Sequence, residues 1–169
     1  MKVSSKRGFT LVEILIVVVI MGILAAIVVP QFSQSSDDAR FTSTVSNLQS
    51  VRGQVDLYRN QHEGRLPGGT TDSTDDTTFH DHLTLPSNEG GVTGGFADPN
   101  FPYGPYIHNQ LPANPFNGSR KVQNTATFGA TAPGGDTTAD PGWVYERTSG
   151  RFRINKTGNA PDGTAYWSL

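Results

Sequence analysis

The chain has 169 residues and a formal net charge of −2, a balance that argues against nucleic acid as a partner. It contains no cysteine, which excludes disulfides, thiol catalysis and zinc sites built on thiolates. Hydrophobic residues make up 35% of the chain. They are concentrated near the N-terminus, so we expect the remainder to have a small core and much loop.

An apolar run from Phe9 to Val29 follows three basic residues, Lys2, Lys6 and Arg7. As a helix, this run is about 30 Å long, which is enough to cross the hydrocarbon core of a bilayer. Basic residues beside a first span tend to stay in the cytoplasm. The pattern therefore predicts a transmembrane helix over residues 9–29, with the N-terminus on the cytoplasmic side.

Glu13 lies at the start of this apolar run. An unpaired carboxylate in lipid costs on the order of a few kcal/mol or more, and neither a secretory signal nor an ordinary membrane anchor requires one. Two interpretations of Glu13 stay open. The carboxylate is either solvated among the lipid headgroups or paired with a cation. Cleavage between Gly8 and Phe9 would supply that cation, since it creates an α-amino group at Phe9, four residues before Glu13. The two groups could pair within one chain or between neighbouring chains.

The segment "RGFTLVEILIVVVIMGILAAIVVPQF" resembles the N-terminus of type IV prepilins and of the pseudopilins of type II secretion. The shared pattern is a short basic leader, Gly, Phe-Thr-Leu-Val-Glu, an apolar stretch and a proline at its far end. The resemblance implies that a prepilin peptidase removes residues 1–8 as a leader and that Phe9 is then N-methylated. It also implies that Glu13 guides assembly by pairing with the N-terminus of an adjacent subunit.

Apolar residues recur at steps of three and four beyond Pro30, which predicts an amphipathic continuation of the helix over residues 30–63. We interpret this stripe as ordinary core packing. Pro30 lacks an amide donor and is expected to loosen the helix. Gly22 either weakens the helix or permits close packing in the membrane. We expect both residues to matter in assembly, and Gly64 to cap the helix. The stripe consists of Phe41, Val45, Leu48, Val51, Val55 and Tyr58.

Residues 64–169 are expected to form a loop-rich globular head, because turn signals such as "LPGGTTD" and "ADPNFPYGPY" are frequent there. A short helix is predicted over about residues 75–85, capped by Thr74 or Asp75. The stretch "WVYERTSGRFRIN" predicts a hairpin with "TSG" as its turn, and "KVQNTATFG" is a further candidate strand. The predicted fold class is α+β: a long N-terminal α-helix packed on a small antiparallel β-sheet head, type IV pilin-like.

The head also resembles the major pseudopilin of type II secretion, through "GPYI…LPANPFNG" and "GWVYERTSGRFRIN". Many type IV pilins close a C-terminal loop with a disulfide, which this chain cannot form, so the pseudopilin branch is favoured. Those pseudopilins tend to carry an Asp-Pro-Trp-Gly-like segment near a calcium loop, where this chain has "NPFNG". Because the carboxylate is missing, calcium is not supported, and we predict no cofactor.

His80 and His82 in "FHDHL" are the strongest candidates for metal ligands. On a helix, residues two apart point to nearly opposite sides, and the sequence offers no obvious third ligand, so no metal site is predicted. His62 and His108 are interpreted as isolated surface or loop residues. The sequence has no phosphate-binding loop, nucleophile elbow or paired catalytic acids, and we do not expect an enzyme.

The leading hypothesis is a structural subunit that is stored in the membrane and polymerises, with itself and with other pseudopilins, into a type II secretion pseudopilus that supports protein export. The resemblance implies a prepilin peptidase, an inner-membrane platform protein and an assembly ATPase as partners. It places the chain in the bacterial inner membrane as a single-pass protein with its head in the periplasm. Two alternatives remain: a type IV pilus subunit for adhesion or motility, and a membrane-anchored enzyme or ligand-binding domain.

Overall fold

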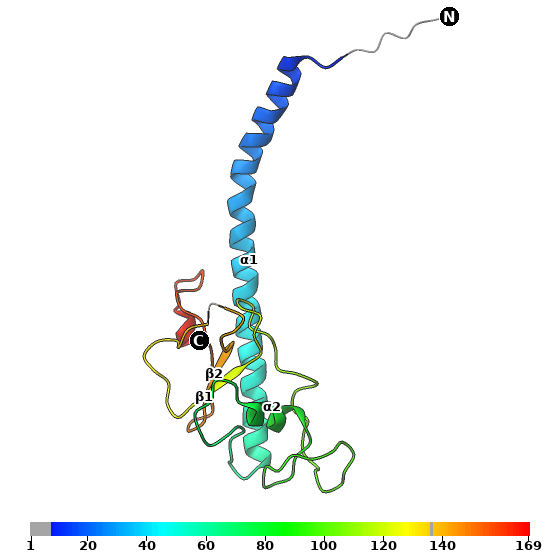
Figure 1. Cartoon of the computed structure of the whole chain (residues 1–169), viewed down its shortest axis with the longest axis vertical. Helices are drawn as coiled ribbons and strands as arrows, with labels where there is room; N and C mark the ends of the chain where they lie inside the picture. Colours follow the sequence, from blue (N-terminus) through cyan, green and yellow to red (C-terminus); the bar gives the residue numbers. More distant parts are fainter. Residues whose placement is uncertain (1–7, 136) are drawn as a thin grey trace, which may run out of the picture. The chain divides into compact units, whose positions relative to one another are not determined.

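The computed structural model describes residues 8–135 and 137–169, so most of the expected leader lies outside it. The chain divides into two units, Met1–Asp38 and Ala39–Leu169, and the long helix contributes residues to both. The elements, in chain order (Figure 1), are α1 (Leu11–Gln61), α2 (Thr77–Thr84), β1 (Val122–Thr125), β2 (Trp143–Glu146), β3 (Arg151–Ile154) and the 3-10 helix η1 (Tyr166–Ser168).

The N-terminal unit consists mainly of the first part of α1. Its segment Leu11–Val28 has a mean hydropathy of 3.1 and buries none of its residues within the chain. By length and composition this segment could cross a membrane. The helix continues through Pro30, so the proline does not end it. The prediction of a long N-terminal helix is confirmed.

The amphipathic part of α1 lies in the C-terminal unit and forms one side of its core. Leu48, Val51, Val55 and Tyr58 are at most 2% exposed, while Phe41 packs against the same cluster from a half-buried position. The interpretation of this stripe as core packing is therefore confirmed. Residues from α2, the sheet and the loops complete the core: Phe79, Leu83, Leu111, Val122, Trp143, Tyr145, Phe152, Ile154, Ala160 and Tyr166.

Helix α1 ends in a turn built on left-handed backbone. Gly64 has φ +84°, and its N–H donates to the Arg59 carbonyl at 2.8 Å, which satisfies one of the carbonyls left open at a helix end. Glu63 beside it also has a positive φ, of 55°. Gly64 closes the helix as predicted.

Helix α2 begins at a buried aspartate. The Asp76 carboxylate accepts from the Phe79 N–H at 3.2 Å, so Asp76 is the cap, and the prediction of Thr74 or Asp75 was wrong by one or two positions. The same carboxylate accepts from the Gly69 N–H at 2.8 Å and from Asn124 Nδ2 at 2.7 Å. Both partners lie outside α2, and Asn124 is 48 residues away in sequence, so tertiary contacts fix which aspartate turns inward.

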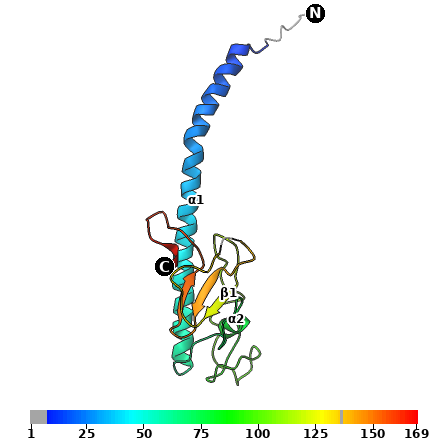
Figure 2. The same cartoon turned by 60° about the vertical axis from the view of Figure 1, so that its left-hand side comes forward.

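Three strands form the sheet, in the order β1-β2-β3. The predicted hairpin is confirmed: β2 and β3 are antiparallel, and Trp143 pairs with Ile154 while Tyr145 pairs with Phe152. Strand β1 runs parallel to β2, so the sheet is mixed and not antiparallel throughout. The connection from β1 to β2 is long enough to return the chain to the same end of the sheet. Figure 2 shows β1 and α2 beside the lower part of α1.

Candidate assembly site at the start of helix α1

The peptide bond predicted to be cleaved lies just before α1. Gly8 and Phe9 have no regular secondary structure and are exposed, and the helix begins two residues later, at Leu11. A Cβ placed on Gly8 would meet nothing within 4 Å, and the Phe9 side chain is 86% exposed. No other part of the described chain shields this bond.

Glu13 forms a reciprocal cap with Thr10. The Thr10 N–H donates to Glu13 Oε2 at 2.7 Å, and the Thr10 hydroxyl donates to the same oxygen at 2.8 Å. In return, the Glu13 N–H donates to Thr10 Oγ1 at 3.2 Å. This arrangement is a capping box, which satisfies two of the free N–H groups at a helix start. A negative charge there is also favoured by the helix dipole.

Thr10 is therefore a partner of Glu13 that the sequence analysis did not predict. The signal was available, because a threonine followed three residues later by a glutamate, just before an apolar run, is the sequence pattern of a capping box. The sequence analysis considered lipid, solvent and the α-amino group of Phe9, in the same chain or in a neighbouring one, as surroundings for Glu13. The structure adds a partner within the same chain.

Gly22 and Pro30 lie on α1 away from this capping box. At 1.5 Å per residue, Gly22 is about 14 Å and Pro30 about 25 Å along the helix from Glu13. A Cβ placed on Gly22 would meet nothing within 4 Å, so this glycine leaves a shallow gap on an exposed helix surface. The side chain of Pro30 lies outside what the structure describes. The predicted assembly residues are therefore spread along the apolar part of the chain and do not form one cluster.

The apolar side chains around Gly22 are exposed, because no other part of the described chain covers them. Ile16 is 53% exposed, Val19 52% and Leu24 56%, values that would be unusual for a soluble domain. An exposed surface of this size requires lipid or another protein. Together with the exposed bond at Gly8, it makes this end of the chain the candidate site for processing and assembly.

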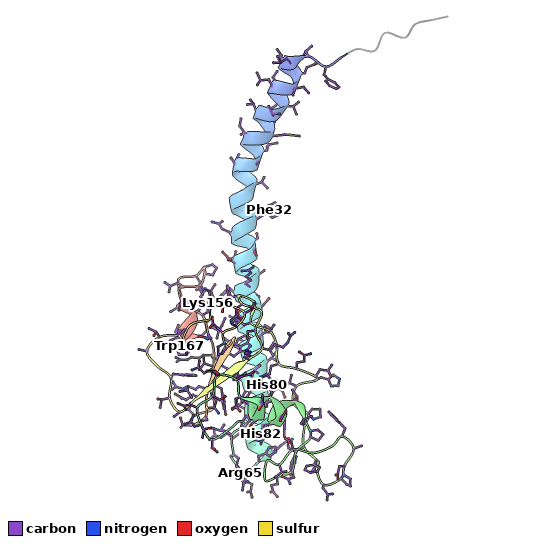
Figure 3. All side chains as sticks on the ribbon, viewed as in Figure 1. Phe32, Arg65, His80, His82, Lys156 and Trp167 are labelled. Atoms are coloured by element: carbon purple, nitrogen blue, oxygen red, sulfur yellow. The ribbon has the colours of Figure 1, made fainter. Side chains whose placement is uncertain are left out.

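His80 and His82 do not form a metal centre. Both lie on α2 (Figure 3). His82 Nδ1 accepts from the Gly68 N–H at 3.0 Å, and His80 Nε2 lies 3.8 Å from Asp75 Oδ1. Burial lowers the pKa of both imidazoles. Within residues 8–135 and 137–169, no group of three or more His, Cys, Asp or Glu could hold a metal ion.

The interpretation of His62 as a surface or loop residue was wrong. This side chain is fully buried, with Nδ1 2.7 Å from the Tyr58 carbonyl oxygen and Nε2 2.9 Å from Ser87 Oγ. Its ring stacks on Tyr58 with 3.8 Å between centroids. Ser87 comes from a loop far away in sequence, so the local pattern gave no sign of burial. His108 lies exposed in a loop, as predicted.

The "NPFNG" segment is a hydrogen-bonded turn. Asn114 Nδ2 donates to the Gly142 carbonyl at 2.8 Å, and Asn114 Oδ1 accepts from the Phe116 N–H at 2.8 Å. Asn117 Oδ1 accepts from the Ser119 N–H at 3.0 Å. Both amide oxygens are therefore already used, and no carboxylate stands beside them in this segment. These residues do not fit a calcium shell.

Comparison with known proteins agrees with this geometry. The family described as "Prokaryotic N-terminal methylation motif" matches residues 3–29. That range contains the exposed Gly8–Phe9 bond, the capping box and the exposed apolar part of α1. No solved structure matches the chain.

The curated relatives carry the name "Type II secretion system core protein G". The one from Klebsiella michiganensis is 44% identical over 59 residues, 35% of this chain and 42% of that protein. The match therefore spans less than half of that relative. The Klebsiella pneumoniae relative is 31% identical over 126 residues, 75% of this chain and 80% of that protein. The Aeromonas hydrophila relative is 31% identical over 129 residues, with 76% and 80% covered. The chain belongs to the type II secretion system core protein G family.

Proposed function

We propose that this chain is a structural subunit of a type II secretion pseudopilus, which supports protein export. The subunit is cleaved between Gly8 and Phe9, N-methylated at Phe9, held in the inner membrane by residues 9–29, and then polymerised. The observation that carries this proposal is the uncovered apolar surface of α1 between Leu11 and Val28. A chain with such a surface needs lipid before assembly and other helices after it.

The capping box leaves one carboxylate oxygen of Glu13 for a second partner. Glu13 binds Thr10 only through Oε2, so Oε1 can accept from an additional donor. The amine created at Phe9 of an adjacent subunit is the donor that we propose. In the low dielectric of a packed helix core, an unmatched carboxylate is costly and a matched one is partly compensated. This pair also fixes the axial position of an incoming subunit, since apolar surfaces slide past each other easily.

The proposed topology follows from the charges at the N-terminus. Lys2, Lys6 and Arg7 keep that end in the cytoplasm, which places residues 64–169 in the periplasm as the head. The proposed partners are those that cleavage and polymerisation of a pseudopilin require: a prepilin peptidase, an inner-membrane platform protein, an assembly ATPase and other pseudopilins. The relatives' printed names favour secretion over a pilus for adhesion or motility.

The test is intact-mass analysis of the chain extracted from membranes of cells that carry a type II secretion system. We expect the loss of residues 1–8 and the gain of one methyl group, together with fibres that can be sheared from cells overproducing the chain. A mature protein that keeps Met1, or one that begins near Val28, would contradict the proposal. Gly8→Val should block the cleavage and abolish the fibres.

A further inference from the structure

Two glycines in the loop after α1, Gly68 and Gly69, are held by side chains from α2 and β1. The Gly68 N–H donates to His82 Nδ1 at 3.0 Å, and the Gly69 N–H donates to Asp76 Oδ2 at 2.8 Å. The Gly69 carbonyl accepts from Asn124 Nδ2 at 2.8 Å. Gly68 has φ +106°, a conformation that favours glycine, and neither glycine has a side chain that could anchor it. The position of this segment, the diglycine turn, therefore depends on these hydrogen bonds.

The bond from Gly68 fixes the protonation state of the His82 imidazole. A backbone N–H can only donate, so Nδ1 of His82 carries no proton and accepts through its lone pair. The proton of the neutral ring is then on Nε2. A second proton can bind only at Nδ1, where it would displace the Gly68 N–H. Acid and the diglycine turn therefore compete for one lone pair.

The groups that face the His82 ring come from α1, from α2 and its cap, and from the loop after α2: His62, Tyr58, Asp76, Asp81 and the Gly91 backbone. The two carboxylates and the hydrogen bond with the Gly91 backbone favour the charged imidazole, whereas burial and the neighbouring imidazole oppose it. Burial is the largest of these effects, so the pKa of His82 lies below its ordinary value of 6.5. The tyrosine stacks on the ring with 5.4 Å between centroids and stays neutral, because burial raises its pKa to about 12.

The diglycine turn has space into which it can move and a carboxylate that can replace it. It borders a cavity of about 460 Å³, which Arg147 and Thr148 also line. A Cβ placed on Gly68 would lie 2.9 Å from Asp76 Oδ2, so this carboxylate lies beside the turn and close to His82 Nδ1. A protonated Nδ1 could therefore donate to Asp76, in a charge-assisted hydrogen bond, once the turn has withdrawn.

We propose that His82 is an acid-sensitive latch for the diglycine turn. At neutral pH the imidazole accepts from Gly68, and the turn is closed. When Nδ1 takes up a proton, the Gly68 N–H loses its acceptor and the turn moves into the cavity, while the charged ring pairs with Asp76. The latch is independent of the proposed function, because every group in it belongs to the unit Ala39–Leu169 and none to residues 9–29.

The direction of the pH dependence follows from which form of the turn allows the proton to bind. With the turn open, His82 takes up a proton near the ordinary pKa of 6.5, whereas with the turn closed it does so only at lower pH. The free energy of opening is therefore highest above pH 6.5 and decreases as the pH falls below that value. Between about pH 7.5 and about pH 5, the open fraction should rise roughly tenfold.

The first experiment determines the tautomer of His82 by nitrogen-15 NMR on the full-length chain in detergent micelles at neutral pH. We expect Nε2 to carry the proton and Nδ1 to show the chemical shift of an unprotonated acceptor. A titration followed by the same signals should give a pKa below 6.5 for this ring. A ring that carries its proton on Nδ1 would overturn the latch, because that nitrogen could not accept from Gly68.

The second experiment measures hydrogen exchange of the Gly68 amide at about pH 7.5 and about pH 5, corrected for the intrinsic pH dependence of exchange. Protection of Gly68 should fall roughly tenfold at the lower pH, while the amides shared between β2 and β3 stay protected. His82→Asn should keep Gly68 protected at both pH values, because its Oδ1 can replace Nδ1 as the acceptor and does not titrate. His80→Gln removes the other imidazole of α2 and is the matched control, in which the tenfold fall should remain.

Two results of the exchange experiment would overturn the latch. Equal losses of protection at Gly68 and in β2 and β3 would mean that acid unfolds the whole unit. A fall in His82→Asn as large as in the unaltered chain would assign the opening to another group. The tautomer is measured on the unaltered chain, so the latch stays testable if His82→Asn does not fold. Neither experiment requires cleavage or fibres, and failure of the proposed function would leave both results unchanged.

Discussion

At the scale of single residues, Glu13 caps its own helix, and the proposed contact with a neighbouring amine would be a second role. Thr10 donates two hydrogen bonds to Glu13 Oε2, and the Glu13 N–H donates one to Thr10 Oγ1. The capping box needs a side-chain acceptor at this position, which glutamine also supplies. The proposed contact with a neighbouring amine needs a negative charge. Substitutions can therefore separate these two roles.

Glu13→Gln and Glu13→Val form the informative pair. Both should reduce or abolish fibres, because neither side chain can neutralise an amine, and both should leave cleavage after Gly8 largely intact. The Val variant should also enter the membrane more easily, and it alone should lose the cap at Thr10. Processed chain in membranes is compared with sheared fibres. Normal fibres from the Gln variant would exclude the charge pair, while normal fibres from both would leave Glu13 as a solvated residue at the edge of the lipid.

Two histidines should make the stability of the C-terminal unit depend on pH. Burial lowers the folded-state pKa of His80 and His82 below the ordinary value of 6.5, against the opposing charges of Asp75 and Asp76. As the pH falls, the two imidazoles therefore take up protons in the unfolded chain before they do so in the folded one. Their contribution to the free energy of unfolding is fully present above pH 6.5 and decreases below it. The urea midpoint should be lower at about pH 5 than at about pH 7.5.

The control for this pH dependence is the double variant His80→Gln and His82→Gln, which removes both titrating groups. Its midpoint should change less between the same two pH values. An unchanged difference would assign the effect to other groups, such as the carboxylates. Glu146 is one of these, because its hydrogen bonds from Ser149 and Phe128 outweigh burial and lower its pKa.

At the scale of elements, the stability of α2 depends on its cap, which is Asp76 and not Asp75. Asp76→Ala should lower the free energy of unfolding by roughly 2 to 4 kcal/mol, since it removes the cap and leaves the Gly69 N–H without an acceptor. Asn124 Nδ2 loses one of its two acceptors and keeps the Gly69 carbonyl. Asp75→Ala, its exposed neighbour, should change it by less than about 0.5 kcal/mol. Chemical denaturation measures both. Equal effects would mean that the two aspartates share the cap.

The local pattern of apolar residues was sufficient to predict the elements whose pairing partners are adjacent in the chain. The hairpin followed from alternating apolar residues on both sides of "TSG", and α1 followed from its apolar stripe. The parallel pairing of β1 with β2 could not be read in this way, because it depends on how the intervening loop returns. The burial of His62 was missed for the same reason, since its partner Ser87 is brought in by the fold.

At the scale of the whole molecule, the core is contained in the C-terminal unit. All of its members lie between Leu48 and Tyr166, inside the unit Ala39–Leu169. Deletion of residues 1–32 should therefore leave a soluble, monomeric head, because the stripe of α1 is covered by its own domain. Analytical ultracentrifugation without detergent tests this expectation. Precipitation, or a need for micelles, would mean that the apolar part of α1 also stabilises the head.

The uncovered helix surface has a consequence for how a fibre of this chain could disassemble. Each side chain between Leu11 and Val28 would meet water if a subunit were released into solution, and at about 1.5 to 3 kcal/mol for each large apolar side chain the total reaches tens of kcal/mol. If the chain forms the proposed fibre, spontaneous loss of single subunits into solution is then negligible on any cellular timescale. A fibre of this chain can shorten only by returning its subunits to lipid at the base, or it must be broken and discarded in pieces.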